Sequence, residues 1–252
     1  MTKIAISGAN GKMGHTIYNC ICERNDCEII AGIDPYTKEY ADFPIVDTPE
    51  KLPETPDVII DFSNPSSLDG ILGYCLSTGT PVVLATTGYS DEQIAKIKAA
   101  AEHIAIFFTF NMSLGINLLV QLAKKAASIL GDRFDIEIVE KHHNQKIDAP
   151  SGTAIMLANA INETLDNSKN YVYDRHSRRQ KRDKSEIGMH SIRGGTIVGE
   201  HDVIFAGHDE VITLSHSAAS KTVFAEGSIN AAIYISGKGA GLYDMSELVI
   251  DK

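Results

Sequence analysis

Short apolar runs alternate with amphipathic stretches along the first 110 residues. Five runs have the length and apolar character of buried strands: Lys3–Ser7, Glu28–Asp34, Asp57–Asp61, Pro81–Ala85 and Ile104–Phe108. Between them, helical periodicity predicts helices at residues 12–24 and 91–101, the second capped by Ser90 with Glu92 nearby. Strands that alternate with helices are typical of βαβ units, which build a parallel sheet. The pattern therefore predicts a doubly wound α/β domain in this part of the chain.

The pattern changes after Ser113, where a long apolar stretch predicts a helix at about residues 115–130. The elements expected beyond it are an alternating strand at 134–140, a helix at 153–165, and β-rich segments at 196–205 and 210–217 joined by a turn. Together they predict a smaller α+β domain with an open mixed sheet. A closing helix at 223–235 precedes a glycine-rich tail, which we expect to return to the first domain because the ends of an inserted domain are commonly close. The predicted domains are residues 1–113 with 222–252, and residues 114–221.

Composition narrows the class of protein. With 252 residues, 43% apolar and 22% charged, the chain resembles an ordinary well-packed globular protein. No segment reaches the roughly 20 apolar residues of a membrane span, and the N-terminus lacks the regions of a signal peptide, so we expect a cytoplasmic location. The cysteines at positions 20, 22, 27 and 75 are unevenly spaced. This spacing favours reduced, packed thiols over a zinc site.

The charge distribution bears on the kind of partner. A formal net charge of -10 argues against nucleic acid or an anionic membrane, since both require a surface of the opposite sign. The segment Arg175–Lys184 differs, because it holds six of the 23 Lys and Arg residues. It could be a patch that binds a polyanion. Because the segment has neither interleaved aromatic residues nor apolar periodicity, we favour a solvated loop beside an anionic ligand.

Three glycines follow the first predicted strand, at positions 8, 11 and 14. Gly8 permits a tight turn, Gly11 lets the backbone approach a pyrophosphate, and Gly14 lets the helix pack closely on the strand. Asp34 ends the second strand, where a carboxylate can accept hydrogen bonds from an adenosine ribose. The alternative is a plain strand-to-helix connection, with Asp34 a turn residue before Pro35. The combination favours a Rossmann-type dinucleotide site, and the absence of a suitably placed Gly-Lys-Ser/Thr excludes a Walker-type loop.

Two further loops follow predicted parallel strands. Thr86-Thr87-Gly88 comes after the fourth strand and Phe110-Asn111-Met112-Ser113 after the fifth. The carboxyl ends of the strands in an open α/β sheet border the crevice where ligands bind. We therefore expect both loops to lie beside the nucleotide.

The stretch EKHHNQKIDAPSGTA, residues 140–154, concentrates side chains capable of chemistry. His142 and His143 lie at the end of a predicted strand, Lys146 lies in the following loop, and Ser151 is a plausible helix N-cap. The amides of residues 152 and 153 fall in the first helical turn, which lacks partners within the helix and suits a carboxylate or phosphate. The alternative is that Ser151 only caps the helix while the histidines and lysine decorate a solvated loop.

A metal site is a further alternative, in which the two histidines join His190 or His216. It lacks paired ligand spacing, and Lys146 would repel the cation. A dinucleotide site and a cationic pocket in one chain instead indicate a hydride transfer. In that reaction a nicotinamide supplies hydride, the pocket holds an anionic substrate, and His or Lys supplies the balancing proton.

These residues resemble the dihydrodipicolinate reductase family. The resemblance rests first on Glu140-x-His142-His143-x-x-Lys146-x-Asp148-Ala149-Pro150-Ser151-Gly152-Thr153-Ala154, a long and specific motif. It extends to the glycine loop and to Asp61-Phe62-Ser63, Thr86-Thr87-Gly88, Asn111-Met112-Ser113 and Gly241-Leu242-Tyr243-Asp244-Met245. It thus covers nearly the whole chain.

The resemblance implies the reduction of a cyclic imine dicarboxylate, 4-hydroxy-tetrahydrodipicolinate, to tetrahydrodipicolinate by NADH or NADPH in the diaminopimelate route to lysine. It implies His142 as acid/base, Lys146 as proton donor, and His143 with the amides of Gly152 and Thr153 as carboxylate ligands. The cofactor contacts that it implies come from Gly8, Ala9, Asn10, Gly11, Lys12, Met13, Ala85, Thr86, Thr87, Phe110, Asn111, Met112 and Ser113. It also implies a homotetramer built through the sheets of the second domains.

The nucleotide preference stays open at this point. Many members of the family follow the acidic residue with an arginine that can meet a 2'-phosphate, whereas Pro35 follows Asp34 here. Asp34 favours NADH by repelling that phosphate, while Lys12 could attract it.

Two other functions compete with the reductase. A semialdehyde-type dehydrogenase would need an activated cysteine, and Cys75 lies in a predicted helix without a neighbouring base in sequence. A nucleotide-binding regulator would bind the cofactor without catalysis.

Overall fold

A computed structural model describes residues 1–109 and 111–250, apart from the side chains of residues 249 and 250. The chain divides into two compact units, one formed by residues 1–114 and 221–252 and the other by residues 115–220. Within the described residues, no helix is long and apolar enough to cross a membrane.

The first unit contains a seven-stranded sheet in the order β12-β6-β5-β4-β1-β2-β3, and every pair of neighbours is parallel. Its strands are β1 (Thr2–Ser7), β2 (Cys27–Ile33), β3 (Ile45–Val46), β4 (Val58–Asp61), β5 (Val82–Leu84), β6 (Ala105–Phe108) and β12 (Gly241–Tyr243). Its helices are α1 (Lys12–Cys22), α2 (Leu68–Thr78), α3 (Asp91–Ala100), α6 (Thr222–Ile235) and α7 (Met245–Ile250). This confirms the Rossmann-type α/β prediction.

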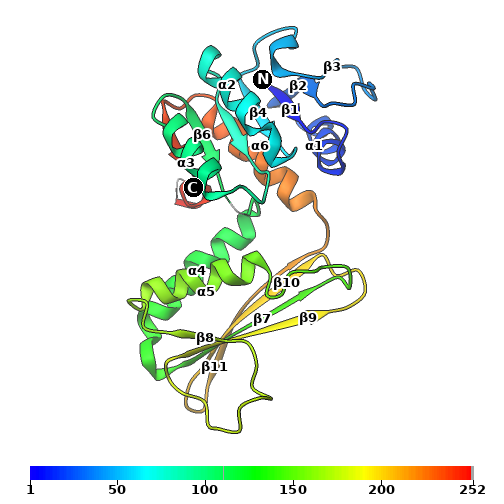
Figure 1. Ribbon diagram of the computed structural model, residues 1–252. Coiled ribbons are helices and arrows are strands. Elements are labelled where there is room, and N and C mark those ends of the chain that lie inside the picture. The colour runs from blue at the N-terminus through cyan, green and yellow to red at the C-terminus, as the bar shows by residue number, and fades with distance from the viewer. Residues whose placement is uncertain (110, 251–252) are drawn as a thin grey trace. The chain divides into compact units, whose positions relative to one another are not determined.

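Helices cover both faces of this sheet (Figure 1). On one face, residues of α1 and α6 share a core with alternate residues of the strands, among them Ile17, Ile229 and Ile60. On the other face, α2 and α3 pack against the intervening strand residues, among them Leu72, Ile97 and Ile59. Because successive side chains of a strand point to opposite faces, the apolar runs of the central strands serve both cores.

Local signals set the helix starts in this unit. Ser90 caps α3 as predicted, accepting a hydrogen bond from the Gln93 amide at 3.3 Å while the Gln93 side chain accepts one from the Ser90 amide at 3.0 Å. The partner in this capping box is therefore Gln93 and not the neighbouring Glu92.

The C-terminal tail returns to the first unit, as expected. It pairs with the sheet through β12, which lies parallel to β6.

The second unit contains a five-stranded sheet in the order β11-β10-β7-β9-β8. Its elements are α4 (Leu114–Leu130, residues 115–130 in this unit), β7 (Asp135–His142), α5 (Gly152–Thr164), β8 (Asn170–Val172), β9 (Glu186–Arg193), β10 (Gly199–Ala206) and β11 (Val211–Ala218). Strands β7, β9 and β8 run parallel to one another, whereas β10 is antiparallel to both of its neighbours, β7 and β11. The sheet is therefore mixed, as predicted, and α4 and α5 lie on one face of it (Figure 1).

Two strands of this sheet, β8 and β9, were not among the predicted elements. In β9, Gly188 and the polar residues around it obscure the strand pattern. A Cβ on Gly188 would lie 1.7 Å from Glu137 Oε2, so glycine is needed where the neighbouring side chain crosses the strand. Glycine weakens a strand signal in sequence even where close approach requires it.

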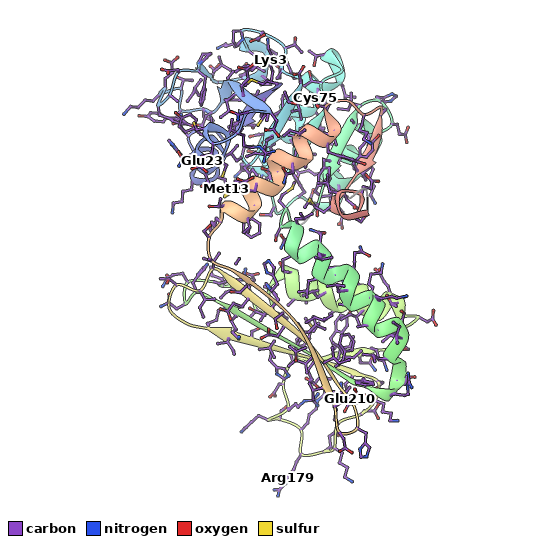
Figure 2. The ribbon with its side chains drawn as sticks, turned by 180° about the vertical axis from the view of Figure 1, so that it is seen from behind. Lys3, Met13, Glu23, Cys75, Arg179 and Glu210 are labelled. Carbon is purple, nitrogen blue, oxygen red and sulfur yellow. The ribbon has the colours of Figure 1, made fainter. Side chains whose placement is uncertain are left out.

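The basic segment 175–184 is an exposed loop, as predicted, except at Arg175 and Arg182, which are partly buried in ion pairs. The guanidinium of Arg175 contacts Glu137 and Glu186 at 2.7 Å each. Arg182 contacts Glu137 at 2.9 Å and Asp135 at 2.8 Å. These carboxylates come from strands, so the segment is anchored to its own sheet, while Arg179 projects away from the fold (Figure 2).

Candidate active site

The loop after β1 lies where the strand order changes direction. Strand β1 has β2 on one side and β4 on the other, which is the topological switch point where open α/β sheets bind ligands. Gly8 begins the loop with a φ of +80°, a conformation that favours glycine. A Cβ on Gly8 would lie 2.6 Å from the carbonyl oxygen of Phe62 in the loop after β4. Glycine therefore lets the two loops meet at the edge of the sheet.

The other two glycines shape the start of α1. A Cβ on Gly14 would lie 2.3 Å from the Ala9 carbonyl oxygen, so this glycine allows the helix to approach the loop. Gly11 occupies the N-cap position with extended backbone, and no side chain caps the helix. The first turn of a helix presents amides without partners inside the helix, and α1 has no acidic residue there to oppose an anion. This geometry fits a dinucleotide pyrophosphate.

Asp34 connects the glycine loop to the segment after β2. Its carboxylate accepts hydrogen bonds from the Asn10 amide at 3.0 Å and from the Tyr36 amide at 2.9 Å. The Asn10 side chain in turn donates to the backbone carbonyls of Tyr36 and Lys38. Asp34 therefore holds the loop in shape as well as presenting a carboxylate at the predicted place.

The loops after β4 and β5 meet through a buried carboxylate, Asp61, which is 1% exposed. It accepts hydrogen bonds from Ser63 at 2.5 Å, Thr86 at 2.7 Å and Tyr89 at 3.2 Å. The Ala85 amide also donates to the Asp61 carbonyl at 2.9 Å. These bonds fix the backbone of the predicted cofactor residues Ala85 and Thr86 and commit the Thr86 hydroxyl to Asp61.

The remaining predicted cofactor residues lie at neighbouring positions of the first unit. Thr87 follows Thr86 in the same loop and is exposed, as is Lys12 in α1, whereas Met13 is half-buried. After β6, the Asn111 side chain accepts a hydrogen bond from the Ser113 amide at 2.8 Å, and Met112 is buried. Phe110 lies outside the described residues.

A small group of polar residues lies on the helix-covered face of the second unit's sheet. Glu140 and His142 lie two residues apart on β7, so both side chains point to that face. In register with them are Arg193, opposite His142 on β9, and His201, opposite Glu140 on β10. Residues paired across neighbouring strands share a face, so three strands place four polar side chains together.

Glu140 is fully buried and is the centre of this group. Its Oε2 lies 2.6 Å from His142 Nδ1, and both its oxygens accept hydrogen bonds from Arg193, at 2.8 and 2.7 Å. Burial alone would raise the pKa of the Glu140 carboxyl, but the Arg193 guanidinium and the His142 ring outweigh it and lower that pKa to about 2. The ionised carboxylate holds His142 by its Nδ1 and leaves Nε2 for chemistry. A Cβ on Gly199 would lie 3.2 Å from that Nε2, so glycine keeps the space beside it open.

The start of α5 is tied to the same carboxylate. The Ser151 amide donates to Glu140 Oε1 at 3.1 Å, and the Ser151 hydroxyl caps the helix by accepting from the Ala154 amide at 3.2 Å. A Cβ on Gly152 would meet no atom within 4 Å, so the space beside the first turn is open there. The predicted residues Gly152 and Thr153 therefore lie one and two positions beyond a residue that Glu140 holds directly.

The loop from residue 143 to 150 carries the other predicted residues. Lys146 Nζ contacts Asp148 at 2.9 Å, and this hydrogen bond lowers the pKa of the Asp148 carboxyl. The Lys146 amide donates to the His143 carbonyl at 3.2 Å, and Ala149–Pro150 is a cis peptide bond. The Asn144 amide donates to the Gly195 carbonyl at 3.2 Å, which fixes the loop against the turn after β9.

The residues of the two alternative sites, a catalytic cysteine and a metal site, lie in other surroundings. Cys75 is fully buried, and burial raises the pKa of its thiol to about 12, the opposite of an activated nucleophile. His190 contacts Glu137 at 2.8 Å. Among residues 1–109 and 111–250, no group of three or more His, Cys, Asp or Glu side chains is arranged to hold a metal ion.

Two residues of this group, Arg193 and His201, were not predicted from the sequence. Both lie on strands more than 50 positions after Glu140, and neither belongs to a recognisable local motif. For Arg193 no local signal was available, since β9 itself was not predicted. His201 carried one signal, because it follows the alternation of β10 onto a buried position, where a histidine needs a polar partner.

Comparisons with known proteins agree with this geometry. A family model described as dihydrodipicolinate reductase, N-terminus, matches residues 2–112, and one described as dihydrodipicolinate reductase, C-terminus, matches residues 115–249. The chain is 48% identical over 99% of its length to a 4-hydroxy-tetrahydrodipicolinate reductase of Caldanaerobacter subterraneus subsp. tengcongensis, with 98% of that protein covered. It is 45% identical over 100% of both chains to the protein of that name from Clostridium novyi.

A solved structure is also similar. It is a dihydrodipicolinate reductase from Paenisporosarcina sp. TG-14 with dipicolinate bound, at a TM-score of 0.80 and 27% identity, covering 97% of each chain. A myo-inositol dehydrogenase from Corynebacterium glutamicum matches at a TM-score of 0.62 and 14% identity, over 99% of this chain and 93% of that one. The second match shows a shared fold alone.

Proposed function

The chain belongs to the dihydrodipicolinate reductase family and is a pyridine-nucleotide-dependent 4-hydroxy-tetrahydrodipicolinate reductase, and we propose which of its residues carry out the reaction. It reduces a cyclic imine dicarboxylate to tetrahydrodipicolinate, a hydride transfer in lysine biosynthesis by the diaminopimelate route. The first unit, with the glycine loop, binds the cofactor. The second unit, with the group around Glu140, binds and protonates the substrate.

The cofactor site is formed by the loops at the carboxyl ends of β1, β2, β5 and β6. The residues assigned to it are Gly8, Ala9, Asn10, Gly11, Lys12, Met13, Asp34, Ala85, Thr86, Thr87, Phe110, Asn111, Met112 and Ser113. A reduced nicotinamide, when bound, supplies the hydride. Since Asp34 places a carboxylate where a 2'-phosphate would lie and exposed Lys12 offers a compensating charge, NADH is the better cofactor and NADPH is tolerated.

The substrate is held by its carboxylates. The amides of Gly152 and Thr153 at the start of α5, together with His143, bind them, because a helix N-terminus and a neighbouring cation both favour negative charge. Lys146 lies in the loop that joins His143 to this helix and donates the proton to the ring nitrogen. Its contact with Asp148 orients the ammonium group.

His142 is the acid/base residue. With Nδ1 fixed by the ionised Glu140, proton exchange takes place at Nε2, in the space that Gly199 leaves open. Arg193 is a positioning residue, since it compensates the buried Glu140 charge and does not itself bind substrate. The single observation that carries these assignments is that Glu140 contacts both His142 and the start of α5.

The test is the oxidation of NADH and NADPH, followed by absorbance, in the presence of freshly generated 4-hydroxy-tetrahydrodipicolinate. Oxidation that requires this imine supports the proposal, and NADH should give the higher kcat/KM. Cofactor binding without oxidation would instead indicate a regulator, and reduction of aspartate semialdehyde would indicate a dehydrogenase of the other class.

Family resemblance also leads us to propose a cytoplasmic homotetramer assembled through the sheet of the second unit. Light scattering after gel filtration tests the number of subunits.

A further inference from the structure

His201 has no role in the reaction as described, yet its position is unusual for a histidine. It is 4% exposed, lies on β10 opposite Glu140, and packs its ring edge-on against His142 with 5.3 Å between ring centroids. Its Nε2 lies 3.1 Å from the Ser151 hydroxyl. His201 thus contacts both the acid/base residue and the cap of the helix assigned to the substrate carboxylates.

The two ring nitrogens of His201 differ in their partners. Nδ1 is buried and has no hydrogen-bond partner among the described residues. Nε2, which lies beside the Ser151 hydroxyl, is therefore the nitrogen through which the ring is held. The imidazole is neutral, since burial and then the neighbouring His142 lower the pKa of His201 to about 4. A neutral ring adds no positive charge beside His142.

The Ser151 hydroxyl joins His201 to the start of α5. Its oxygen accepts one hydrogen bond from the Ala154 amide, and the hydroxyl forms a second with Nε2 of His201. The Ser151 amide is meanwhile held by Glu140. Ser151 is therefore fixed by its backbone through β7 and by its side chain through β10, which leaves the start of α5 little freedom to shift.

We propose that His201 is a positioning residue for the reduction, which fixes the Ser151 hydroxyl through Nε2 and supports the His142 ring through its edge. It thereby keeps a constant separation between the acid/base imidazole and the amides that bind the substrate. The inference rests on the proposed roles of His142, Gly152 and Thr153. Nothing in it involves the cofactor loops, so its effects should be confined to the substrate.

Three substitutions at position 201 separate hydrogen bonding from packing. His201→Phe keeps a ring and removes both nitrogens, His201→Gln places an amide near the position of Nε2, and His201→Asn places it near that of Nδ1. We expect His201→Phe to raise the KM for the imine dicarboxylate and to lower kcat, so that kcat/KM falls by about tenfold in all, the usual scale for one lost hydrogen bond. The KM for the cofactor should stay within about twofold. His201→Gln should restore most of the loss, and His201→Asn should not.

A double-mutant cycle with Ser151→Ala tests the link itself. If His201 acts through the Ser151 hydroxyl, the effects of Ser151→Ala and His201→Phe on substrate KM should fall short of additive by about threefold or more. His216, opposite His201 on β11, is the matched control. His216→Phe should leave the steady-state constants within about twofold of the unsubstituted enzyme. Thermal unfolding of each variant identifies loss of folding, and if His201→Phe does not fold, the Gln and Asn pair decides.

Equal behaviour of His201→Gln and His201→Asn, or additive effects in the cycle, would overturn the inference. Lys146→Ala and His142→Gln are assayed in parallel. If those two lose turnover while the His201 variants keep it, only the positioning role fails. If Lys146→Ala and His142→Gln also keep normal turnover, the proposed catalytic assignments fail with it.

Discussion

Arg193 and Glu140 form a two-pronged ion pair, in which both guanidinium Nη atoms donate to the carboxylate at 2.8 and 2.7 Å. Arg193 also donates to the Asp148 carbonyl at 2.6 Å. A strand outside the sequence motif therefore supports His142, the proposed acid/base residue, and the loop that carries Lys146.

Replacing Arg193 with Ala should destabilise the protein strongly. The substitution leaves the buried Glu140 carboxylate without its guanidinium counterion, and breaking a buried ion pair typically costs about 3–5 kcal/mol. Urea denaturation measures the loss. Lys96→Ala is the control, because its ion pair with Asp69 is exposed and should contribute less than about 1 kcal/mol. Equal losses for the two variants would contradict a structural role for the Arg193 pair.

Acid should remove the contribution of Glu140 to the stability of the folded protein in a defined pH range. Its pKa falls from an ordinary 4.5 to about 2 in the folded protein. A carboxyl group whose pKa is lower in the folded than in the unfolded protein stabilises the fold fully at pH values above its unfolded pKa. This stabilisation is lost as the pH falls through the folded pKa. The stability advantage of the unsubstituted protein over Glu140→Gln should therefore be constant above pH 5 and shrink from about pH 4.5 towards 2. Urea denaturation at a series of pH values measures this difference in the free energy of unfolding. A difference that grows on acidification would contradict a lowered pKa for Glu140.

Removal of either proposed proton-transfer group should slow the reaction without loss of cofactor. His142→Gln and Lys146→Ala are each expected to lower kcat by about a hundredfold or more, the usual scale for general acid–base catalysis. Cofactor binding, followed by fluorescence titration, should be unchanged. His190→Gln is the control, because His190 is half-exposed and contacts Glu137 outside the group around Glu140. Near-normal turnover in both His142→Gln and Lys146→Ala would end the assignment.

Asp34 should affect the two nucleotides differently. Asp34→Ala removes a ribose acceptor and also the bonds from the Asn10 and Tyr36 amides, so binding of both nucleotides should weaken. NADH should lose more than NADPH, because the substitution also removes the repulsion of the 2'-phosphate. Asp34→Asn, which keeps one acceptor oxygen, should show the same preference with a smaller overall loss. Michaelis constants for both nucleotides measure this, and equal losses would reject the role in discrimination.

Thiol alkylation should not inactivate the enzyme. All four cysteines are free, and Cys22 is exposed whereas Cys20, Cys27 and Cys75 are buried. Burial raises the pKa of the thiols of Cys20 and Cys27 to about 11, so they too resist alkylation. Iodoacetamide should label Cys22 in the folded enzyme and leave turnover intact, as mass spectrometry and a parallel assay can determine. Inactivation that follows modification of Cys75 would revive the semialdehyde dehydrogenase alternative.

The sequence allowed the fold class and the family to be predicted, and both are confirmed. Local signals sufficed for five of the seven strands of the first sheet, all but the short β3 and β12. They sufficed because βαβ units repeat a strand-to-helix pattern and Gly8 is required by a positive φ and by contact with the next loop. The motif at 140–154 was recognisable because its residues are neighbours in sequence. The roles assigned to those residues stay predictions.

What could not be predicted depends on pairing between distant strands. Gly188 lowers the strand signal of β9, yet it is the residue that makes room for Glu137. Arg175 and Arg182 looked solvated because their partners, Glu137 and Glu186, are identified only once the sheet is assembled. For the same reason, Arg193 and His201 could not be connected to Glu140 from local patterns.

The parallel pairing of β7 with β9 has a consequence for biosynthesis of the chain itself. Parallel neighbours need a long crossover, and Arg193 is made 53 residues after Glu140. During synthesis on the ribosome, the Glu140 carboxylate therefore lacks its counterion until β9 has emerged. Burial of β7 is deferred until then. Glu140 and His142 therefore become ordered only after β9 has been made, late in the synthesis of the second unit.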